Sequence, residues 1–138
     1  MELSDLVGIH YLEGFEKTYK KNPDSYYEEE VETIRVKLDG IIYECYIDPS
    51  DGYRSYISGL SISGQPMEFP YDIPQKVEIL YVSRDPEDEY SEGWDVIHVI
   101  NPKTRALILE LGTKRYDELY PHAVCNWYPE AMEINRYR

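Results

Sequence analysis

The stretch from Glu32 to Ile47 constrains the fold more than any other part of the chain. Two alternating runs of apolar and polar residues meet at Asp39-Gly40, a dipeptide that favours a two-residue hairpin turn with positive φ at both positions. Such a turn fixes the register and sets three apolar pairs on one side, namely Leu38 opposite Ile41, Val36 opposite Tyr43, and Ile34 opposite Cys45. Arg35 then faces Glu44 on the other side as a pair of opposite charge. The stretch therefore predicts a hairpin with one apolar face.

Other short apolar runs follow the same pattern along the chain. They are residues 9–16, 53–62, 76–82, 94–100, 105–111 and 122–128. Clusters of Gly, Pro, Asp and Asn separate them, and the 15 tyrosines favour pleated structure. Six to eight short strands without a long amphipathic helix predict an all-β fold, mainly antiparallel, as a small barrel or sandwich with at most short helical turns. With 138 residues and no linker, we expect one domain over 1–138.

Glycine and proline predict where these runs bend or end. Gly14 interrupts the first run and indicates a bulge or a close backbone approach. Asn101-Pro102-Lys103-Thr104 is typical of a turn with proline pre-setting φ, and Gly112 is expected to end the strand that follows. We expect one helical turn over 116–120 and another over 129–133, with Pro129 at its first position.

The charge balance limits the partners. Lys and Arg total 14 against 27 Asp and Glu, which gives a formal charge of −13. Such a surface repels nucleic acid and anionic membranes, so we expect neither as a direct partner. It suits a soluble protein or one that meets a basic protein surface. Two acidic loops, 24–32 and 85–95, are the candidate contact regions, and the second supplies four binding candidates: Asp85, Glu87, Asp88 and Glu89.

The two cysteines, Cys45 and Cys125, are too few for a disulfide scaffold. Cys45 falls on the apolar face of the hairpin, where a free cysteine behaves as a small hydrophobe. The first residues lack the basic and apolar regions of a signal peptide, and no window approaches 18 apolar residues. We therefore expect a cytoplasmic, reduced protein.

The loop 48–56 is the most suggestive polar stretch. It contributes five candidate binding residues, Asp48, Asp51, Tyr53, Arg54 and Tyr56. Its spacing is not that of a calcium-binding EF-hand. The alternative is a structural turn in which the aspartates accept backbone N–H bonds. The segment 116–128, with Tyr120, His122 and Trp127, is expected to line the other side of the same mouth.

Signals for catalysis or for a metal are weak. The three histidines and two cysteines lack the close spacing of zinc ligands. In the run 94–100, His98 shares a face with Trp94, Val96 and Ile100, which predicts a hydrogen-bonded core or boundary histidine. His122 and Cys125 point to opposite faces if 122–128 is a strand. No nucleophile, phosphate-loop or dinucleotide motif is present, so we expect no enzyme activity, no cofactor and no metal.

Three groups of residues resemble an uncharacterised family of small acidic phage and prophage proteins. They are 38–44, 48–55, and Leu111-Gly112-Thr113 followed by Tyr120-Pro121. The likeness covers Leu6 to about Glu130 and rests on turns and strands. No activity is attached to that family. The resemblance implies a mobile-element context, in which small acidic proteins often bind and block host machinery, an analogy at the level of class.

Two functional expectations follow. The first is a non-enzymatic acidic interaction protein, from a phage or mobile element, that binds and inhibits a host or phage protein through a basic surface of that partner. The alternative is a small-molecule binder, for a nucleotide-like signal, that uses the 48–56 loop.

Overall fold

In the residues that it describes, the computed structural model has eight β-strands and one short 3₁₀ helix. It describes residues 2–21, 30–47, 56–61, 67–85, 87, 93–116 and 125–129. The elements are η1 (Leu3–Leu6), β1 (Gly8–Lys21), β2 (Glu30–Leu38), β3 (Ile41–Ile47), β4 (Tyr56–Ser61), β5 (Gln75–Arg84), β6 (Gly93–Ile100), β7 (Leu107–Tyr116) and β8 (Cys125–Pro129).

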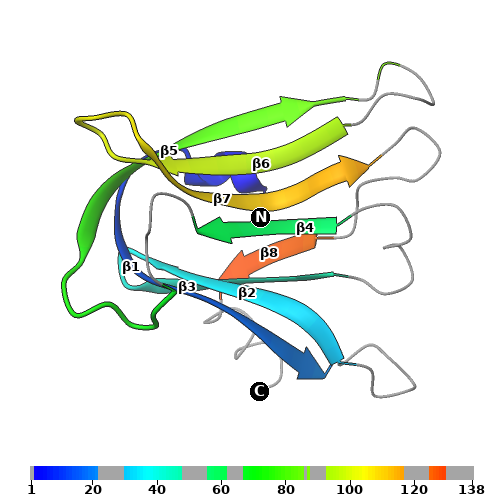
Figure 1. Cartoon of the computed structure of the whole chain (residues 1–138), viewed down its shortest axis with the longest axis horizontal. Helices are drawn as coiled ribbons and strands as arrows, with labels where there is room; N and C mark the ends of the chain where they lie inside the picture. The colour runs from blue at the N-terminus through cyan, green and yellow to red at the C-terminus, as the bar shows by residue number, and fades with distance from the viewer. Residues whose placement is uncertain are drawn as a thin grey trace.

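All eight strands belong to one antiparallel sheet in the order β4-β7-β6-β5-β1-β2-β3-β8. The sheet curls, as Figure 1 shows, and contacts between β3 and β4 bring its two ends together. Within the described strands no ladder joins β4 to β8, so the sheet is not closed. The all-β prediction is confirmed, and the architecture is a single curled sheet, open at one seam.

The hairpin at Asp39-Gly40 has the predicted turn and register. Asp39 has a φ of 52° and Gly40 a φ of 79°, as a two-residue turn of this kind requires. Every pair expected from the sequence is present between β2 and β3. Arg35 Nε lies 3.5 Å from Glu44 Oε2 across the strands. Of the apolar pairs, Ile41 is the member that stays exposed, at 42%.

One apolar core fills the inside of the curl. It draws on both halves of the sheet and on η1, with these members: Leu3, Leu6, Leu12, Phe15, Ile34, Val36, Leu38, Tyr43, Cys45, Val77, Ile79, Ile97, Val99, Ile108, Leu109 and Leu111. A flat sheet of eight strands, spaced about 4.8 Å apart, would keep its outer strands too far from one another to share a core. Curling is what brings β2 and β3 onto the same cluster as β6 and β7.

The bulge predicted at Gly14 is present. The pairing of β1 with β2 shifts between Leu12 and Gly14, and the segment 67–71 crosses this point. Phe15 N–H donates to the Glu68 carbonyl at 2.8 Å. A Cβ on Gly14 would lie 2.9 Å from Phe69 Cδ2. The glycine therefore serves both of its expected purposes, a break in register and a close approach.

Three sequence-based boundaries are wrong. Gly112 lies inside β7, where its backbone pairs with Ser58 on one side and Val96 on the other. Tyr116 is the last residue of β7 and does not begin a helical turn. Pro129 ends β8. At Gly112 and Pro129, cross-strand pairing overrides the local preference of glycine or proline, and proline is tolerated because β8 is an edge strand. At Tyr116, pairing with Gly93 extends the strand. Residues 117–120 and 130–133 lie outside the described part.

Cys45 is disulfide-bonded, which corrects the expectation of a free thiol. Cys125 is the only other cysteine of the chain. The register of β3 and β8 places Trp127 opposite Cys45, and Cys125 opposite Ile47. Positions two residues apart on a strand share a face, so this register brings the two cysteine positions onto one side of adjacent strands. The sequence did not reveal the bond because nothing in it pairs 125–129 with 41–47.

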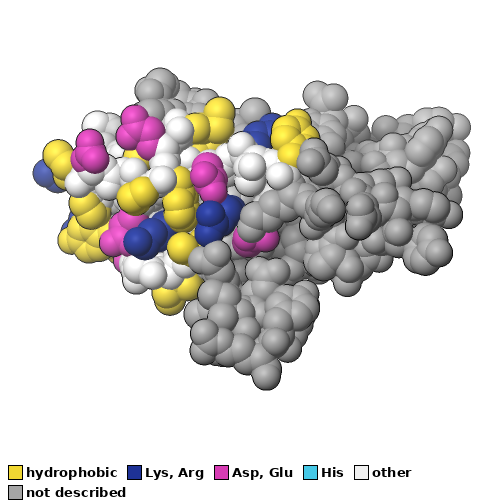
Figure 2. Space-filling model, turned by 90° about the horizontal axis from the view of Figure 1, so that it is seen from below, with side chains coloured by type: hydrophobic (Ala, Val, Ile, Leu, Met, Phe, Trp, Pro, Cys, Tyr) yellow, Lys and Arg dark blue, Asp and Glu magenta, His cyan; other side chains and the backbone are white. Residues whose placement is uncertain are grey.

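The described surface mixes side chains of both signs. Figure 2 shows hydrophobic, acidic and basic side chains interspersed over the described part of one face. Several described acids are paired with bases: Arg35 with Glu16 at 2.9 Å, Lys37 with Glu13 at 4.0 Å, and Arg105 with Glu78. Acidic and basic side chains therefore lie close to one another on the described part of this side.

Candidate functional site

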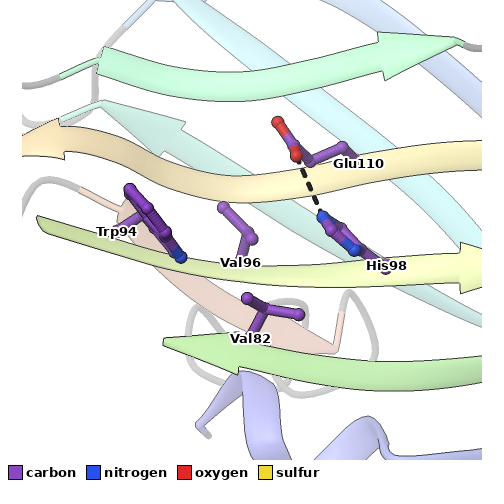
Figure 3. A pocket seen from close by; sticks show the side chains of 5 residues that line it. All are labelled: Val82, Trp94, Val96, His98 and Glu110. Carbon is purple, nitrogen blue, oxygen red and sulfur yellow. Dashed lines mark hydrogen bonds and ion pairs between the residues drawn. The ribbon is translucent and has the colours of Figure 1, made fainter. Parts of the chain in front are cut away.

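A pocket lies on the outer face of β5, β6 and β7, on the side of the sheet away from the core. Five side chains line a cavity of about 310 Å³: Val82, Trp94, Val96, His98 and Glu110 (Figure 3). They come from three neighbouring strands, with β6 in the middle. The pocket is therefore built on the regular part of the sheet.

The register explains why these five side chains meet. Val82 pairs with Val96, and His98 pairs with Glu110. Because alternate residues of a strand point to opposite faces, the residues between them, such as Ile97 and Leu109, enter the core and are fully buried. The alternation of side chains along the strands thus fills the core from one face of the sheet. On the other face it leaves the apolar pair Val82–Val96 and the polar pair His98–Glu110.

The polar end of the pocket is a histidine–glutamate pair. His98 Nε2 lies 2.9 Å from Glu110 Oε2, and the two side chains are 28% and 9% exposed. An ionised carboxylate only accepts hydrogen bonds, so Nε2 carries the proton and donates it. In the neutral ring Nδ1 is then an acceptor, and no hydrogen bond of Nδ1 occurs in the described structure.

The other end of the pocket is aromatic. Trp94 is half-buried, and the Arg84 guanidinium lies over its ring, with Cζ 4.9 Å from the centroid. Such cation–π contacts are attractive and hold the indole in place. Val96, only 1% exposed, lies between Trp94 and His98 on β6 and supplies apolar surface between the two ends (Figure 3).

This arrangement is suited to binding. Small-molecule sites are typically apolar concavities with a few convergent polar groups, and here Trp94 and two valines surround one hydrogen-bonding pair. The five lining residues include no serine, threonine or cysteine, so His98 has no nucleophile beside it within this set.

Most residues proposed from the sequence fall outside the described part. These are Asp48, Asp51, Tyr53, Arg54, Asp88, Glu89, Tyr120 and His122. Tyr56 begins β4 and Trp127 lies in β8, where only their backbone positions are described. Asp85 and Glu87 are exposed. All of these candidates stay predictions.

His98 is confirmed as a hydrogen-bonded boundary histidine. His10 lies elsewhere and spans two acceptors: Nδ1 is 2.6 Å from Asp39 Oδ2, and Nε2 is 2.7 Å from the Leu6 carbonyl. Cys45 is in a disulfide. His10, His98 and Cys45 therefore do not form a common metal site. In the described ranges no three potential metal-binding side chains gather.

The pocket itself was not predicted, although the sequence carries a signal for it. The run from Trp94 to Ile100 is apolar on both faces of a strand, with Trp94, Val96 and His98 on one and Ile97 and Val99 on the other. A strand with two apolar faces is typically covered on both sides. The sequence did not give the strand order. That order places Val82 on β5 and Glu110 on β7 beside the face of β6 that carries Trp94, Val96 and His98.

Comparison with known proteins yields no match to this chain in any protein family, curated protein or solved structure. Over the described ranges, no helix has the length and apolar character needed to cross a membrane.

Proposed function

We propose that this protein is a non-enzymatic binding domain and that the pocket at Trp94 holds a small molecule. The observation that carries the proposal is the combination of an apolar, Trp-lined cavity with the His98–Glu110 pair at one end. The sequence favoured small-molecule binding only as an alternative, at the 48–56 loop. The geometry of the sheet also favours small-molecule binding, but in the Trp94 pocket on β5, β6 and β7.

The size of the cavity indicates the size of the ligand. A volume of about 310 Å³ lies near the lower end of the range for ligand sites, roughly 300 to 1,000 Å³. A single-ring or short branched compound fits such a volume, whereas a dinucleotide does not. Burial of an apolar ring against Trp94 and Val96 would supply most of the affinity, and the polar pair would orient the ligand.

A fragment screen by saturation-transfer NMR tests this proposal. We expect small aromatic fragments to bind the wild-type protein and to lose binding to Val82→Phe, whose larger side chain occupies the pocket. Val7→Phe is the matched control, because Val7 is 51% exposed and does not line the cavity. Equal binding to Val82→Phe and wild type would contradict the assignment.

A second candidate function is the acidic interaction protein expected from the sequence, which binds a host or phage protein with a basic surface. It is favoured by the exposure of Asp85 and Glu87 just after β5, in a chain of net charge −13. Charged surfaces of this kind chiefly raise association rates and make them salt-dependent.

A pull-down from bacterial lysate, washed at rising salt, tests this second candidate function. The double variant Asp85→Lys, Glu87→Lys should release the partner at lower salt, and unchanged retention would count against it.

The disulfide of Cys45 is relevant to the cellular compartment in which the protein works. Disulfides persist in oxidising compartments and are rare in the cytosol. We infer that the oxidised chain is the functional form, so the cytoplasmic location expected from the sequence depends on the state of Cys45 in the cell. Mass spectrometry of the alkylated protein from rapidly quenched cells decides this: two labelled cysteines would show that the reduced form predominates.

A further inference from the structure

We infer that η1 is a pH-dependent cover on the core: a doubly protonated His10 holds it in place, and loss of one ring proton releases it. The inference does not involve the Trp94 pocket, because that pocket lies on the outer face of the sheet and η1 contributes to the core inside the curl. It rests on two hydrogen bonds of the His10 ring and on the apolar residues that η1 buries.

The short helix η1 lies against β5 and β6, as Figure 1 shows, and covers part of the core there. Its buried residues are Leu3 and Leu6, which are 6% and 3% exposed. A Cβ built on Gly112 would lie 3.0 Å from Leu3 Cδ1, so Leu3 also reaches β7. A 3₁₀ helix of four residues is not stable by itself. The position of η1 therefore depends on its contacts with the rest of the chain, and its release would expose both leucines and the core surface beneath them.

The His10 side chain joins η1 to the hairpin of β2 and β3. Its Nε2 lies 2.7 Å from the carbonyl oxygen of Leu6, the last residue of η1, and its Nδ1 lies 2.6 Å from Asp39 Oδ2. A backbone carbonyl and an ionised carboxylate only accept hydrogen bonds. Both ring nitrogens must therefore donate, and only the doubly protonated imidazole has two N–H groups.

A neutral ring can donate to only one of these two acceptors. The Asp39 carboxylate is the stronger of the two because it is charged, so the remaining proton stays on Nδ1. The lone pair of Nε2 then faces the Leu6 carbonyl oxygen, and the contact becomes repulsive. The second proton is present at acidic pH and is lost as pH rises. We therefore expect η1 to be held at low pH and released at higher pH, while the bond between His10 and Asp39 stays.

Asp39 is the charged side chain that bonds the ring among the described residues. On the side of η1, the carboxylate of Asp5 accepts the N–H of Glu2, the cap of its own helix. On β3, burial and then the charge of Asp39 raise the pKa of the Tyr43 phenol above its ordinary value of 10. Tyr43 is therefore uncharged in the pH range in which imidazole titrates.

The charged residues on the strands beside the ring lie on the other face of the sheet or pair with one another. On β5, the fully buried Val77 is opposite the ring, and its neighbours Lys76 and Glu78 point to the outer face because side chains alternate along a strand. On β1 and β2, Glu13 and Lys37 pair with each other at 4.0 Å. The protonation of the ring is thus coupled chiefly to Asp39 and to the Leu6 carbonyl.

Hydrogen exchange of the η1 amides between about pH 5 and about pH 8 tests the inference. The N–H groups of Asp5 and Val7 donate to carbonyls three residues earlier, so their protection factors, corrected for the intrinsic effect of pH on exchange, report whether η1 is in place. We expect both factors to fall about tenfold as pH rises, the order of a hydrogen bond to a charged group. The Tyr11 N–H is the internal control, because it donates to Asp39 Oδ1 in both states of the ring.

Asp39→Asn removes the need for a proton on Nδ1. The amide nitrogen of asparagine can donate to an unprotonated Nδ1 while its oxygen still accepts from Tyr11, and asparagine tolerates the positive φ of this position. A neutral ring with its proton on Nε2 then satisfies both contacts. We expect the protection of Asp5 and Val7 to stay constant over the same pH range in this variant.

A second measurement needs no variant and applies if Asp39→Asn does not fold. The ¹⁵N chemical shifts of the His10 ring in the wild type distinguish protonated from unprotonated nitrogens. We expect both nitrogens to be protonated wherever η1 is protected, and Nε2 to lose its proton as that protection falls.

Three results would overturn the inference. One is constant protection of η1 across the pH series in the wild type, and another is an equal fall in wild type and Asp39→Asn. The third is release of η1 while Nε2 of His10 keeps its proton. These results leave the Trp94 pocket untouched, since fragment binding tests that site separately.

Discussion

Among the described glycines, Gly112 is the one at which an added Cβ would come closest to another atom. Its φ is +139°, a conformation that side-chain-bearing residues rarely adopt. A Cβ built there would lie 2.4 Å from the Asp95 carbonyl oxygen and 2.8 Å from Val96 Cα. Both are backbone atoms of β6, the central strand of the pocket. This glycine thus sets how closely β7 can approach β6, and with it the meeting of Glu110 and His98.

Gly112→Ala should lower the free energy of unfolding by about 3 kcal/mol or more, because backbone strain and a clash with the neighbouring strand add together. Gly8→Ala is the matched control. Gly8 has a φ of +129°, but nothing lies within 4 Å of its built Cβ, so strain alone should cost about 1 to 2 kcal/mol. Urea unfolding of the two variants measures the difference. Equal losses would show that the close approach contributes nothing.

Tyr43 gives an expectation at alkaline pH. Burial and then the charge of Asp39 raise the pKa of its phenol above the ordinary value of 10. The unfolded chain therefore releases this proton at a lower pH than the folded chain does. The stabilisation is fully present below about pH 10 and is lost as pH rises through the folded pKa.

Tyr43→Phe should accordingly make the free energy of unfolding less dependent on pH above 10. Tyr19→Phe, at a side chain that is 64% exposed, is the comparison variant. Denaturant titrations at a series of alkaline pH values provide the measurement. A slope in Tyr43→Phe as steep as that of wild type and Tyr19→Phe would contradict the role given to burial.

Among the elements, the hairpin of β2 and β3 is fastened to β1 by its turn. Asp39 Oδ1 accepts the Tyr11 N–H at 2.8 Å, and its Oδ2 lies 2.6 Å from His10 Nδ1. The Gly40 N–H donates to Glu13 at 2.8 Å. The turn thus supplies both the positive φ that the hairpin needs and the acceptors that orient β1.

A double-mutant cycle with Asp39→Asn and His10→Gln tests this fastening. Asparagine tolerates the same backbone conformation and can still accept from Tyr11, so the cycle isolates the charged contact with His10. We expect a coupling free energy of about 1 kcal/mol, the order of a partly exposed charged hydrogen bond. A coupling free energy near zero would mean that the contact between Asp39 and His10 does not stabilise the attachment of the turn to β1.

The disulfide ties the short edge strand β8 to the rest of the sheet. β8 has five residues and, among the described strands, pairs with β3 alone. The bond from Cys45 to the only other cysteine closes a loop of about 80 residues, which stabilises the folded chain by roughly 4 kcal/mol in the chain-entropy account. Reduction should therefore lower Tm and open the β3 edge.

Hydrogen exchange with and without reductant measures this effect. We expect protection to fall first at the β3 amides that pair with β8, while the ladders of β5, β6 and β7 keep theirs. The double variant Cys45→Ala, Cys125→Ala should match the reduced protein and not respond to reductant. Equal loss of protection across the whole sheet would contradict a local role for the bond.

At the scale of the whole molecule, local patterns predicted the strands, and long-range pairing decided the rest. The register around Asp39-Gly40 and the bulge at Gly14 depend on neighbours in sequence, and both were predictable. The sheet order and the disulfide join segments far apart, and no local pattern encodes them. The pocket belongs to the second kind, because Val82, His98 and Glu110 meet only through the order β5-β6-β7. The sequence predicted that His98 and Trp94 share one face of a strand. It did not predict that β5 and β7, which carry Val82 and Glu110, lie beside that strand.

The distribution of charge also becomes visible only at this scale. A formal −13 suggested an acidic contact surface, but the described acids are partly paired with bases, as Arg35 with Glu16 and Arg105 with Glu78, and Figure 2 shows both signs interspersed. On the described part of the surface, neighbouring bases therefore partly neutralise the acids.

Chemical-shift mapping tests the central claim most directly. The ¹H–¹⁵N spectrum of the oxidised protein is recorded as a small aromatic fragment from the screen is added. We predict that the largest changes fall on the amides of Val82, Trp94, Val96, His98 and Glu110 and on the Trp94 indole. Changes concentrated in 48–56 and 116–128 would place the site at the mouth suggested by the sequence. That result, or a spectrum that does not change, would contradict a ligand site at Trp94.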